Sequence, residues 1–335
     1  MRRGSIVQLV LFALIAIGAA GALALVPAWL PTTASEQADR IDFVFWFVTW
    51  ICVVIFAIVS AVLAYVILKF RRQPDDDSDG PPIHGNTTLE ITWTAIPTVL
   101  VIAIAIVSAI VLARDDRVGK NPLIVDVTAQ QFAWSFKYPG ANGPSSGILR
   151  LPIGRTVKLR IRAIDVLHSF WVPEFGQKQD AVPGIVTTLV ITPNRLGRYP
   201  VICTELCGLG HAVMRTAAVV MPKDAFDKWA NSQQQALAGG GAGAGKAVFT
   251  AQGCGACHTF RPAGAAGKIG PDLDKLSVEA QKAGKPLEGF TRESIVNPNA
   301  YIEPGYPKGV MPQTFAQLPK GQIDALVQYL TKGAK

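Results

Sequence analysis

The chain contains few residues of the kinds that bind soft metals. Among its 335 residues are five Cys, four His and four Met. Charged residues are also scarce, at 17%, whereas 50% of the residues are hydrophobic. This combination is unusual for a soluble protein and predicts membrane-spanning segments. The formal net charge of +8 comes without a basic run interleaved with aromatic residues, so no nucleic-acid partner is expected.

The first 24 residues have two alternative interpretations. Arg2 and Arg3 precede an apolar run at 6–17, and small residues follow at 22–24, which is the arrangement of a secretory signal sequence. The apolar stretch continues to Val26, so a retained membrane span is the alternative. We expect 1–24 to be signal-like, and its removal or retention stays open.

Two further apolar runs predict a transmembrane hairpin within residues 25–118. They cover 43–68 and 96–113, and each can cross a bilayer core, which needs about 20 helical residues. The first run ends in Lys69-Phe70-Arg71-Arg72. By the positive-inside rule this basic cluster predicts that the connecting loop is cytoplasmic and that the rest of the chain is extracytoplasmic.

Residues 119–230 contain short β-branched and aromatic runs separated by Gly, Pro and Asn turns, which predicts a β-sandwich or barrel. Four aromatics alternate with smaller residues and should share one strand face, for which core packing is one interpretation: Phe132, Trp134, Phe136 and Tyr138. A Gly- and Ala-rich stretch at 231–245 predicts a flexible linker. Helical periodicity returns in 246–335, with an apolar stripe near the C-terminus: Ile323, Leu326, Val327 and Leu330.

The first cluster of metal-binding residue types lies between Cys203 and Met214. It includes Cys207 and His211, and His168 upstream offers a second imidazole. Thiolate, thioether and imidazole ligands together favour copper, and one blue copper ion needs only a single Cys. The second Cys therefore favours two coppers bridged by both thiolates. A disulfide and a structural zinc site are weaker alternatives, because zinc has no use for Met214.

From the hairpin to about residue 229 the sequence resembles subunit II of cytochrome c oxidase, which carries the CuA centre. The resemblance rests on Cys203–Met214 and on the segments 165–169 and 180–184, which read DVLHS and DAVPG. It implies a cupredoxin-like antiparallel β-sandwich and a dinuclear copper centre with five side-chain ligands: His168, Cys203, Cys207, His211 and Met214. It also implies that Glu205 binds copper through its backbone carbonyl and magnesium through its side chain, at the interface with subunit I.

One position departs from the family pattern. In the family, electrons reach copper through a tryptophan in a Gln-Trp-aromatic-Trp segment, and here that segment is Gln131-Phe132-Ala133-Trp134. Phe132 therefore stands where the tryptophan is expected. The departure weakens the case for docking of a separate cytochrome here and favours a tethered donor. Phe132 and Trp134 are the candidates for electron uptake.

The second cluster, Cys254-Gly-Ala-Cys257-His258, has the spacing of covalent c-type haem attachment. A thioredoxin-like motif is the alternative, but it needs a βαβ context that this sequence lacks. Met311 is the expected sixth iron ligand, since it is the only Met after Met221 and no His follows His258.

Residues 270–273, Gly-Pro-Asp-Leu, resemble class I cytochrome c. The resemblance implies that the Pro271 carbonyl accepts a hydrogen bond from His258, and a plain turn is the alternative. The predicted domains are thus a signal-like segment (1–24), a hairpin (25–118), a copper domain (119–230), a linker (231–245) and an all-α cytochrome c domain (246–335).

Glu90 precedes the second span in Thr87-Thr-Leu-Glu90, which has the spacing of a capping box. The family resemblance adds a second role, because a glutamate before Ile-x-Trp-Thr lies at the cytoplasmic mouth of a proton-uptake channel into subunit I. Both roles are compatible.

The resemblance implies an electron-relay subunit of a proton-translocating respiratory oxidase in a bacterial plasma membrane. Electrons would pass from an external donor, such as a cytochrome or a cytochrome bc complex, through haem c and copper to the oxygen-reducing subunit I. The chain itself has too few histidines for an oxygen site, since His84 alone lies outside the clusters. A CuA subunit of a nitric oxide reductase and a stand-alone membrane-anchored carrier are the alternatives.

Overall fold

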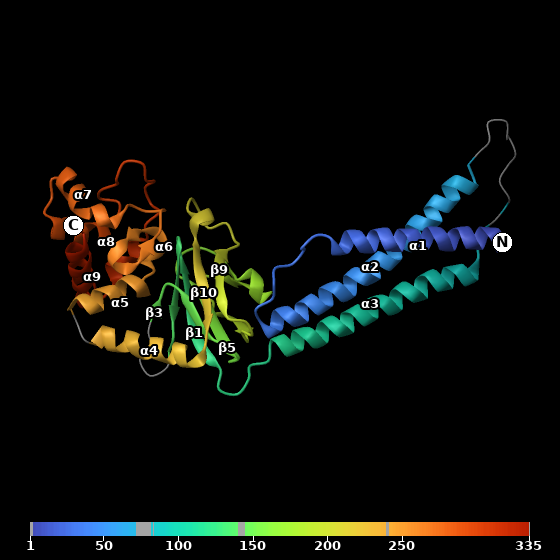
Figure 1. Ribbon diagram of the computed structural model, residues 1–335, viewed down its shortest axis with the longest axis horizontal. Coiled ribbons are helices and arrows are strands. Elements are labelled where there is room, and N and C mark those ends of the chain that lie inside the picture. Colours follow the sequence, from blue (N-terminus) through green and yellow to red (C-terminus); the bar gives the residue numbers. More distant parts are fainter. Residues whose placement is uncertain (1–2, 72–81, 83, 140–144, 239–240, 335) are drawn as a thin grey trace. The chain divides into compact units, whose positions relative to one another are not determined.

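The computed structural model describes all residues except 1–2, 72–81, 83, 140–144, 239–240 and 335 (Figure 1). Arg2 and the middle of the predicted linker lie outside the described residues. The chain divides into a helical unit, residues 1–32 and 39–115, and a globular unit, residues 33–38 and 116–335.

The helical unit consists of three long apolar helices: α1 (Arg3–Leu25), α2 (Glu36–Lys69) and α3 (Thr87–Asp115). All three are long and apolar enough to cross a membrane. The prediction of a two-helix hairpin therefore undercounts the candidate spans by one, because the N-terminal apolar run contains no proline before Pro27 and stays helical. Removal of this segment as a signal stays a prediction.

The start of α3 is closed by side chains. The backbone N–H of Leu89 donates to Oδ1 of Asn86 at 3.2 Å, and the N–H of Asn86 donates to Oε1 of Glu90 at 3.3 Å. This reciprocal pattern is that of a capping box. Glu90 thus helps to close the helix, but its partner is Asn86, four residues before it, rather than Thr87 at the predicted spacing of three.

The first part of the globular unit is a β-sandwich of two five-stranded sheets (Figure 1). One sheet has the order β3 (Ser145–Ser146), β2 (Ala133–Lys137), β1 (Leu123–Gln130), β5 (Val157–Ala163) and β8 (Thr187–Ile191). The other has the order β4 (Leu149–Pro152), β10 (Arg215–Met221), β9 (Gly197–Cys203), β6 (His168–Trp171) and β7 (Lys178–Ala181). Most neighbours are antiparallel, and each sheet has one parallel pair, β1 with β5 and β4 with β10. The apolar core lies between the sheets because side chains alternate between the two faces of each strand.

The four alternating aromatics all point into this core, as predicted, and each is less than 8% exposed. The rings of Trp134 and Phe136 meet Phe170 edge-on at centroid distances of 5.4 and 6.3 Å. The hydroxyl of Tyr138 donates to the Arg150 carbonyl at 3.0 Å and accepts from its N–H at 2.6 Å. Core packing therefore accounts for Phe136 and Tyr138.

The second part of the globular unit is helical. Its helices are α4 (Lys223–Ala238), α5 (Gly241–Ala251), α6 (Cys254–Cys257), α7 (Leu276–Lys282), α8 (Leu287–Val296) and α9 (Lys320–Gly333), with a small hairpin of β11 (Thr259–Phe260) and β12 (Ala265–Ala266). The predicted apolar stripe at Ile323, Leu326, Val327 and Leu330 is buried in a separate core. Apart from the β11–β12 hairpin, this part is helical, as predicted for residues 246–335.

The predicted flexible linker at 231–245 is wrong for most of its length, since α4 continues to Ala238 and α5 begins at Gly241. Two packing contacts explain this. At the start of α4, the rings of Phe226 and Trp229 pack on Tyr138 at 5.9 and 5.2 Å. Within α5, a Cβ on Gly245 would lie 2.2 Å from the backbone oxygen of Ala325 in α9, so this glycine allows the two helices to touch.

We expect Gly245→Ala to lower the free energy of unfolding of the cytochrome domain by about 1–3 kcal/mol, since the added methyl overpacks a backbone contact. Gly243→Ala is the matched control, because Gly243 lies in the same helix with open space around it. There the better helix propensity of alanine should be neutral or stabilising by about 0.5–1 kcal/mol. Calorimetric unfolding of the purified protein measures both, and equal effects would contradict the packing argument.

Candidate copper and haem sites

The copper-domain cluster is assembled by two strands and one loop. The pairing of β6 with β9 places Phe170 opposite Cys203, and Nδ1 of His168, at the start of β6, lies 3.9 Å from Sγ of Cys203. The loop from 204 to 214 then returns to β10, and the N–H of Cys203 donates to the Met214 carbonyl at 3.2 Å. This hydrogen bond closes the base of the loop, so all five predicted side-chain ligands face one point.

The sulfur and nitrogen atoms lie at distances that suit a shared metal centre. Sγ of Cys203 is 3.9 Å from Sγ of Cys207 and 3.9 Å from Nδ1 of His168. Sγ of Cys207 is 3.6 Å from Nδ1 of His211 and 3.8 Å from Sδ of Met214. A disulfide requires sulfur atoms about 2.05 Å apart, and both thiols are free. The donor set of two thiols, two imidazoles and a thioether fits copper.

Glu205 takes part through its backbone. Its carbonyl oxygen accepts from Sγ of Cys203 at 3.2 Å, which places this oxygen in the cluster, where the family resemblance expects it. The Glu205 side chain is half-buried in the same loop.

The two thiols differ in acidity. Burial acts to raise the pKa of Cys203, but hydrogen bonds, that from His168 first, outweigh it and lower the pKa to about 6. Burial and then the neighbouring charge of Cys203 raise the pKa of Cys207 to about 12. The Cys203 thiolate thus forms readily at neutral pH and opposes ionisation of Cys207, and a bound cation would favour loss of that second proton.

Asp165 and Gln131 contact the predicted copper ligands, a role that was not predicted for either of them from the sequence. Oδ1 of Asp165 lies 2.9 Å from Nε2 of His168, which turns Nδ1 toward the sulfurs. Oδ2 of Asp165 accepts from the N–H of Gln131 at 2.6 Å, and Nε2 of Gln131 donates to the Cys207 carbonyl at 2.6 Å. The signal was an aspartate three residues before the histidine, because such partners orient metal-binding imidazoles.

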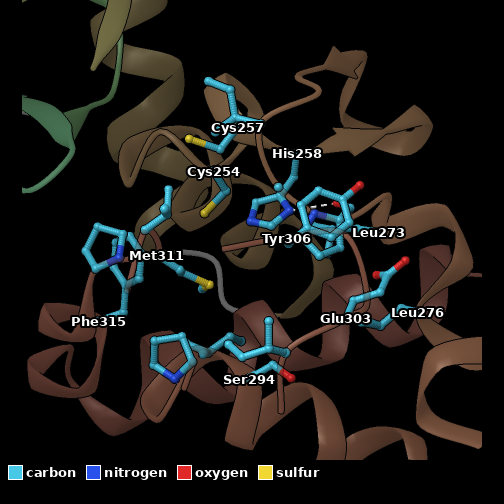
Figure 2. Close-up of a pocket in the computed structure, with 18 of the residues that line it drawn as sticks. Cys254, Cys257, His258, Leu273, Leu276, Ser294, Glu303, Tyr306, Met311 and Phe315 are labelled. Carbon is cyan, nitrogen blue, oxygen red and sulfur yellow. Dashed lines mark hydrogen bonds between the residues drawn. The ribbon is translucent and has the colours of Figure 1, made fainter. Parts of the chain in front are cut away.

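The second cluster lines one largely apolar cavity of the cytochrome domain. Figure 2 shows that Cys254, His258 and Met311 point into this cavity. Cys254 and Cys257 bracket the single turn of α6. Burial raises the pKa of Cys254 to about 12, so the thiol is neutral. Two neutral thiols beside an imidazole, with a thioether in the same cavity, fit a covalently bound c-type haem.

His258 is oriented by its surroundings. Its Nδ1 donates to the Pro271 carbonyl at 2.8 Å, the contact that the resemblance implied, which leaves Nε2 unprotonated and able to bind iron. Burial lowers the pKa of His258, so the neutral form needed by a metal is favoured. Gly270 lets the ring lie close, because a Cβ there would be 2.5 Å from Cε1 of His258.

Phe132 and Trp134 occupy different environments around the copper cluster. Trp134 lies in the sandwich core, with its ring 6.3 Å from that of His168, and its buried Nε1 has no hydrogen-bond acceptor in the described part of the chain. Phe132 lies against the loop at 204–214, called the copper loop below, where a Cβ on Gly210 would be 2.4 Å from its ring. Phe132 also lines the cavity that contains Cys254, His258 and Met311, called the haem cavity below.

Three family models match the chain. They are the transmembrane domain of cytochrome c oxidase subunit II at residues 24–111, its periplasmic domain at 145–221, and cytochrome c at 242–334. Cytochrome c oxidase subunit 2 of Synechocystis is 37% identical over 247 residues, which cover 60% of this chain and 74% of that protein. The chain belongs to the cytochrome c oxidase subunit II family.

A further sequence relative agrees with this assignment, and one solved structure is similar to part of the chain. Cytochrome c oxidase subunit 2 of Alkalihalophilus pseudofirmus is 32% identical over 295 residues, 84% of this chain and 82% of that protein. The crystal structure of the periplasmic domain of subunit II from Bradyrhizobium japonicum overlaps 36% of this chain and 98% of its own, at 26% identity and a TM-score of 0.33. By its family models and sequence relatives, the chain is a membrane-anchored subunit II of a haem–copper oxidase, with a cytochrome c domain at its C-terminus.

We expect Asp165→Ala to weaken copper binding by subunit II about 10–100-fold, the usual cost of losing the partner of a metal-binding histidine. Asp126→Ala is the matched control, because Asp126 is a half-buried aspartate on β1 that forms an ion pair with Arg160. Competition with a copper chelator gives both affinities. Indistinguishable affinities would show that Asp165 does not support His168.

Proposed function

We propose that this subunit II relays electrons from an external donor, through a covalently bound haem c, to a dinuclear copper centre and on to the catalytic subunit I. The proposal depends above all on the 3.9 Å separation of the Cys203 and Cys207 sulfurs, with a nitrogen or thioether donor beside each. At that separation both sulfurs could hold one pair of metal ions, whereas a mononuclear copper site would need only one of them.

In this proposal, five side chains hold the copper pair together with the carbonyl of Glu205: His168, Cys203, Cys207, His211 and Met214. Cys254 and Cys257 would attach the haem, and His258 and Met311 would bind its iron. When bound, both centres supply one-electron redox chemistry. A methionine opposite a histidine raises the reduction potential of a c-type haem, which suits a donor to an oxidase.

The remaining parts of the proposal concern the surroundings. The subunit lies in a bacterial plasma membrane with its copper and cytochrome domains extracytoplasmic, supported by the basic cluster at 69–72 and the positive-inside rule. The Glu205 carboxylate binds magnesium at the subunit I interface, and the external donor is a cytochrome or a cytochrome bc complex. Phe132 lines the haem cavity and the Trp134 ring lies 6.3 Å from that of His168, so we assign electron uptake from the haem to this pair.

Metal content tests the central claim directly. We expect purified subunit II, within its oxidase, to contribute two copper ions and one c-type haem per chain, with a mixed-valence copper signal in the EPR spectrum. Cys207→Ser should retain about one copper ion, because the remaining donors match a mononuclear site. A single copper ion, or zinc, in the unsubstituted chain would refute the dinuclear assignment.

Glu90 is proposed to serve proton uptake as well as helix capping. We expect Glu90→Gln to slow steady-state oxygen consumption while both metal centres keep their spectra, since glutamine keeps the capping acceptor but cannot carry a proton. Asn86→Ala is the control, because it removes the cap, at a cost of about 0.5–2 kcal/mol, and keeps the carboxylate. Unchanged turnover in Glu90→Gln would remove the proton role.

A further inference from the structure

Within the globular unit, the cytochrome domain contacts the copper domain at segments that flank its own haem-binding residues. The carbonyl of Thr250, shortly before Cys254, accepts from the N–H of Gly147 at 3.1 Å. Val310, next to Met311, packs against the apolar core of the copper domain. Hydroxyl Oγ1 of Thr314 donates to Oε1 of Gln130 at 2.6 Å.

On the copper domain, the residues that make these contacts lie next to the proposed copper ligands. Phe132, Ala133 and Val213 line the same cavity as Cys254, His258 and Met311. Val213 immediately precedes Met214, and the Phe132 ring lies against Gly208 and Gly210 of the copper loop. One wall of the haem cavity therefore belongs to the copper domain.

At one point the two domains touch backbone to backbone. A Cβ added to the buried Gly147 would lie 2.2 Å from Cα and 2.7 Å from N of Gly253, the residue before Cys254. Only a glycine fits a gap this narrow, so the sequence at 147 is matched to a closed interface. A transient interface would not require a glycine at position 147.

We propose that these contacts form a permanent haem–copper seam, made by Gln130–Ala133, Gly147 and Val213 on one side and by Thr250–Gly253, Val310 and Thr314 on the other. The seam holds the cytochrome domain in one docked position, with the copper domain closing its haem cavity. This proposal rests on the proposed function and deepens it. The donor domain is fixed rather than swinging on a tether, and the Phe132 surface is covered, so an external donor must approach the cytochrome domain elsewhere.

The physical basis is preorganisation. A domain on a flexible tether loses orientational freedom each time it docks, whereas a domain held by an interface has already lost it. Helix α4 continues to Ala238, which shortens any free tether, and Arg150 lies over the Trp229 ring at 4.9 Å to hold that helix on the sandwich.

Hydrogen–deuterium exchange on the purified oxidase tests the seam. We expect peptides covering 130–134, 145–150 and 247–253 to be protected in the unsubstituted chain. Gly147→Ala should release them, because its methyl cannot fit against Gly253. Thr314→Val removes one hydrogen bond worth about 1 kcal/mol and should raise seam exchange about fivefold. Gly289→Ala is the matched control, because Gly289 is exposed on α8 with open space around it.

Two results would overturn the seam. One is fast exchange of these peptides in the unsubstituted oxidase. The other is a Gly147→Ala exchange pattern equal to that of Gly289→Ala. Optical and EPR spectra of the same samples judge the metal centres separately. Missing haem or copper signals would reject the proposed function, whereas intact signals with an unprotected seam would reject only the docked arrangement.

Discussion

The proposed copper site depends on one constraint, the 3.9 Å separation of the Cys203 and Cys207 sulfur atoms across a short loop. That separation is set by strand pairing: β9 and β10 are antiparallel, and the hydrogen bond from the Cys203 N–H to the Met214 carbonyl closes the loop between them. The loop can then fold back onto the Phe132 ring only because positions 208 and 210 lack side chains. The hydrophobic core of the sandwich restricts the positions of the two sulfurs more than the loop alone could, because close-packed interiors resist small displacements.

Much of the site could be predicted from sequence because its residues are close in the chain. Cys203, Cys207, His211 and Met214 occupy a short span, and rare residue types at such spacing favour a soft-metal site over ordinary packing. His168 could be predicted as a second imidazole donor for the cluster, although its position near Cys203 depends on the pairing of β6 with β9. Asp165 was missed as a supporting residue, since its role appears only once the imidazole has an orientation.

The fold could be predicted where hydrophobic periodicity is strong. The prediction failed in the Gly- and Ala-rich segment, where composition alone suggested a flexible linker. Alternating aromatics gave β2 its buried face, and the apolar stripe gave α9 its packing face. The linker prediction failed because Gly and Ala carry no pattern of polarity, although alanine is the best helix former. Gly245, in the predicted linker, allows α5 to pack closely on the Ala325 carbonyl of α9, and the sequence alone does not show this contact.

The phenylalanine at position 132, where the family resemblance leads one to expect tryptophan, has a physical explanation in a covered surface. Tryptophan suits surfaces that meet water and a partner in turn, because its ring is apolar while its N–H needs a hydrogen-bond acceptor when buried. Phe132 is 7% exposed, beneath the copper loop and against the haem cavity. Phenylalanine has no polar group to satisfy there, whereas Trp134, two residues on, already has a buried Nε1 without an acceptor among the described residues. A second such group would add a desolvation cost of about 1–3 kcal/mol, so a permanently docked cytochrome domain favours phenylalanine at this position.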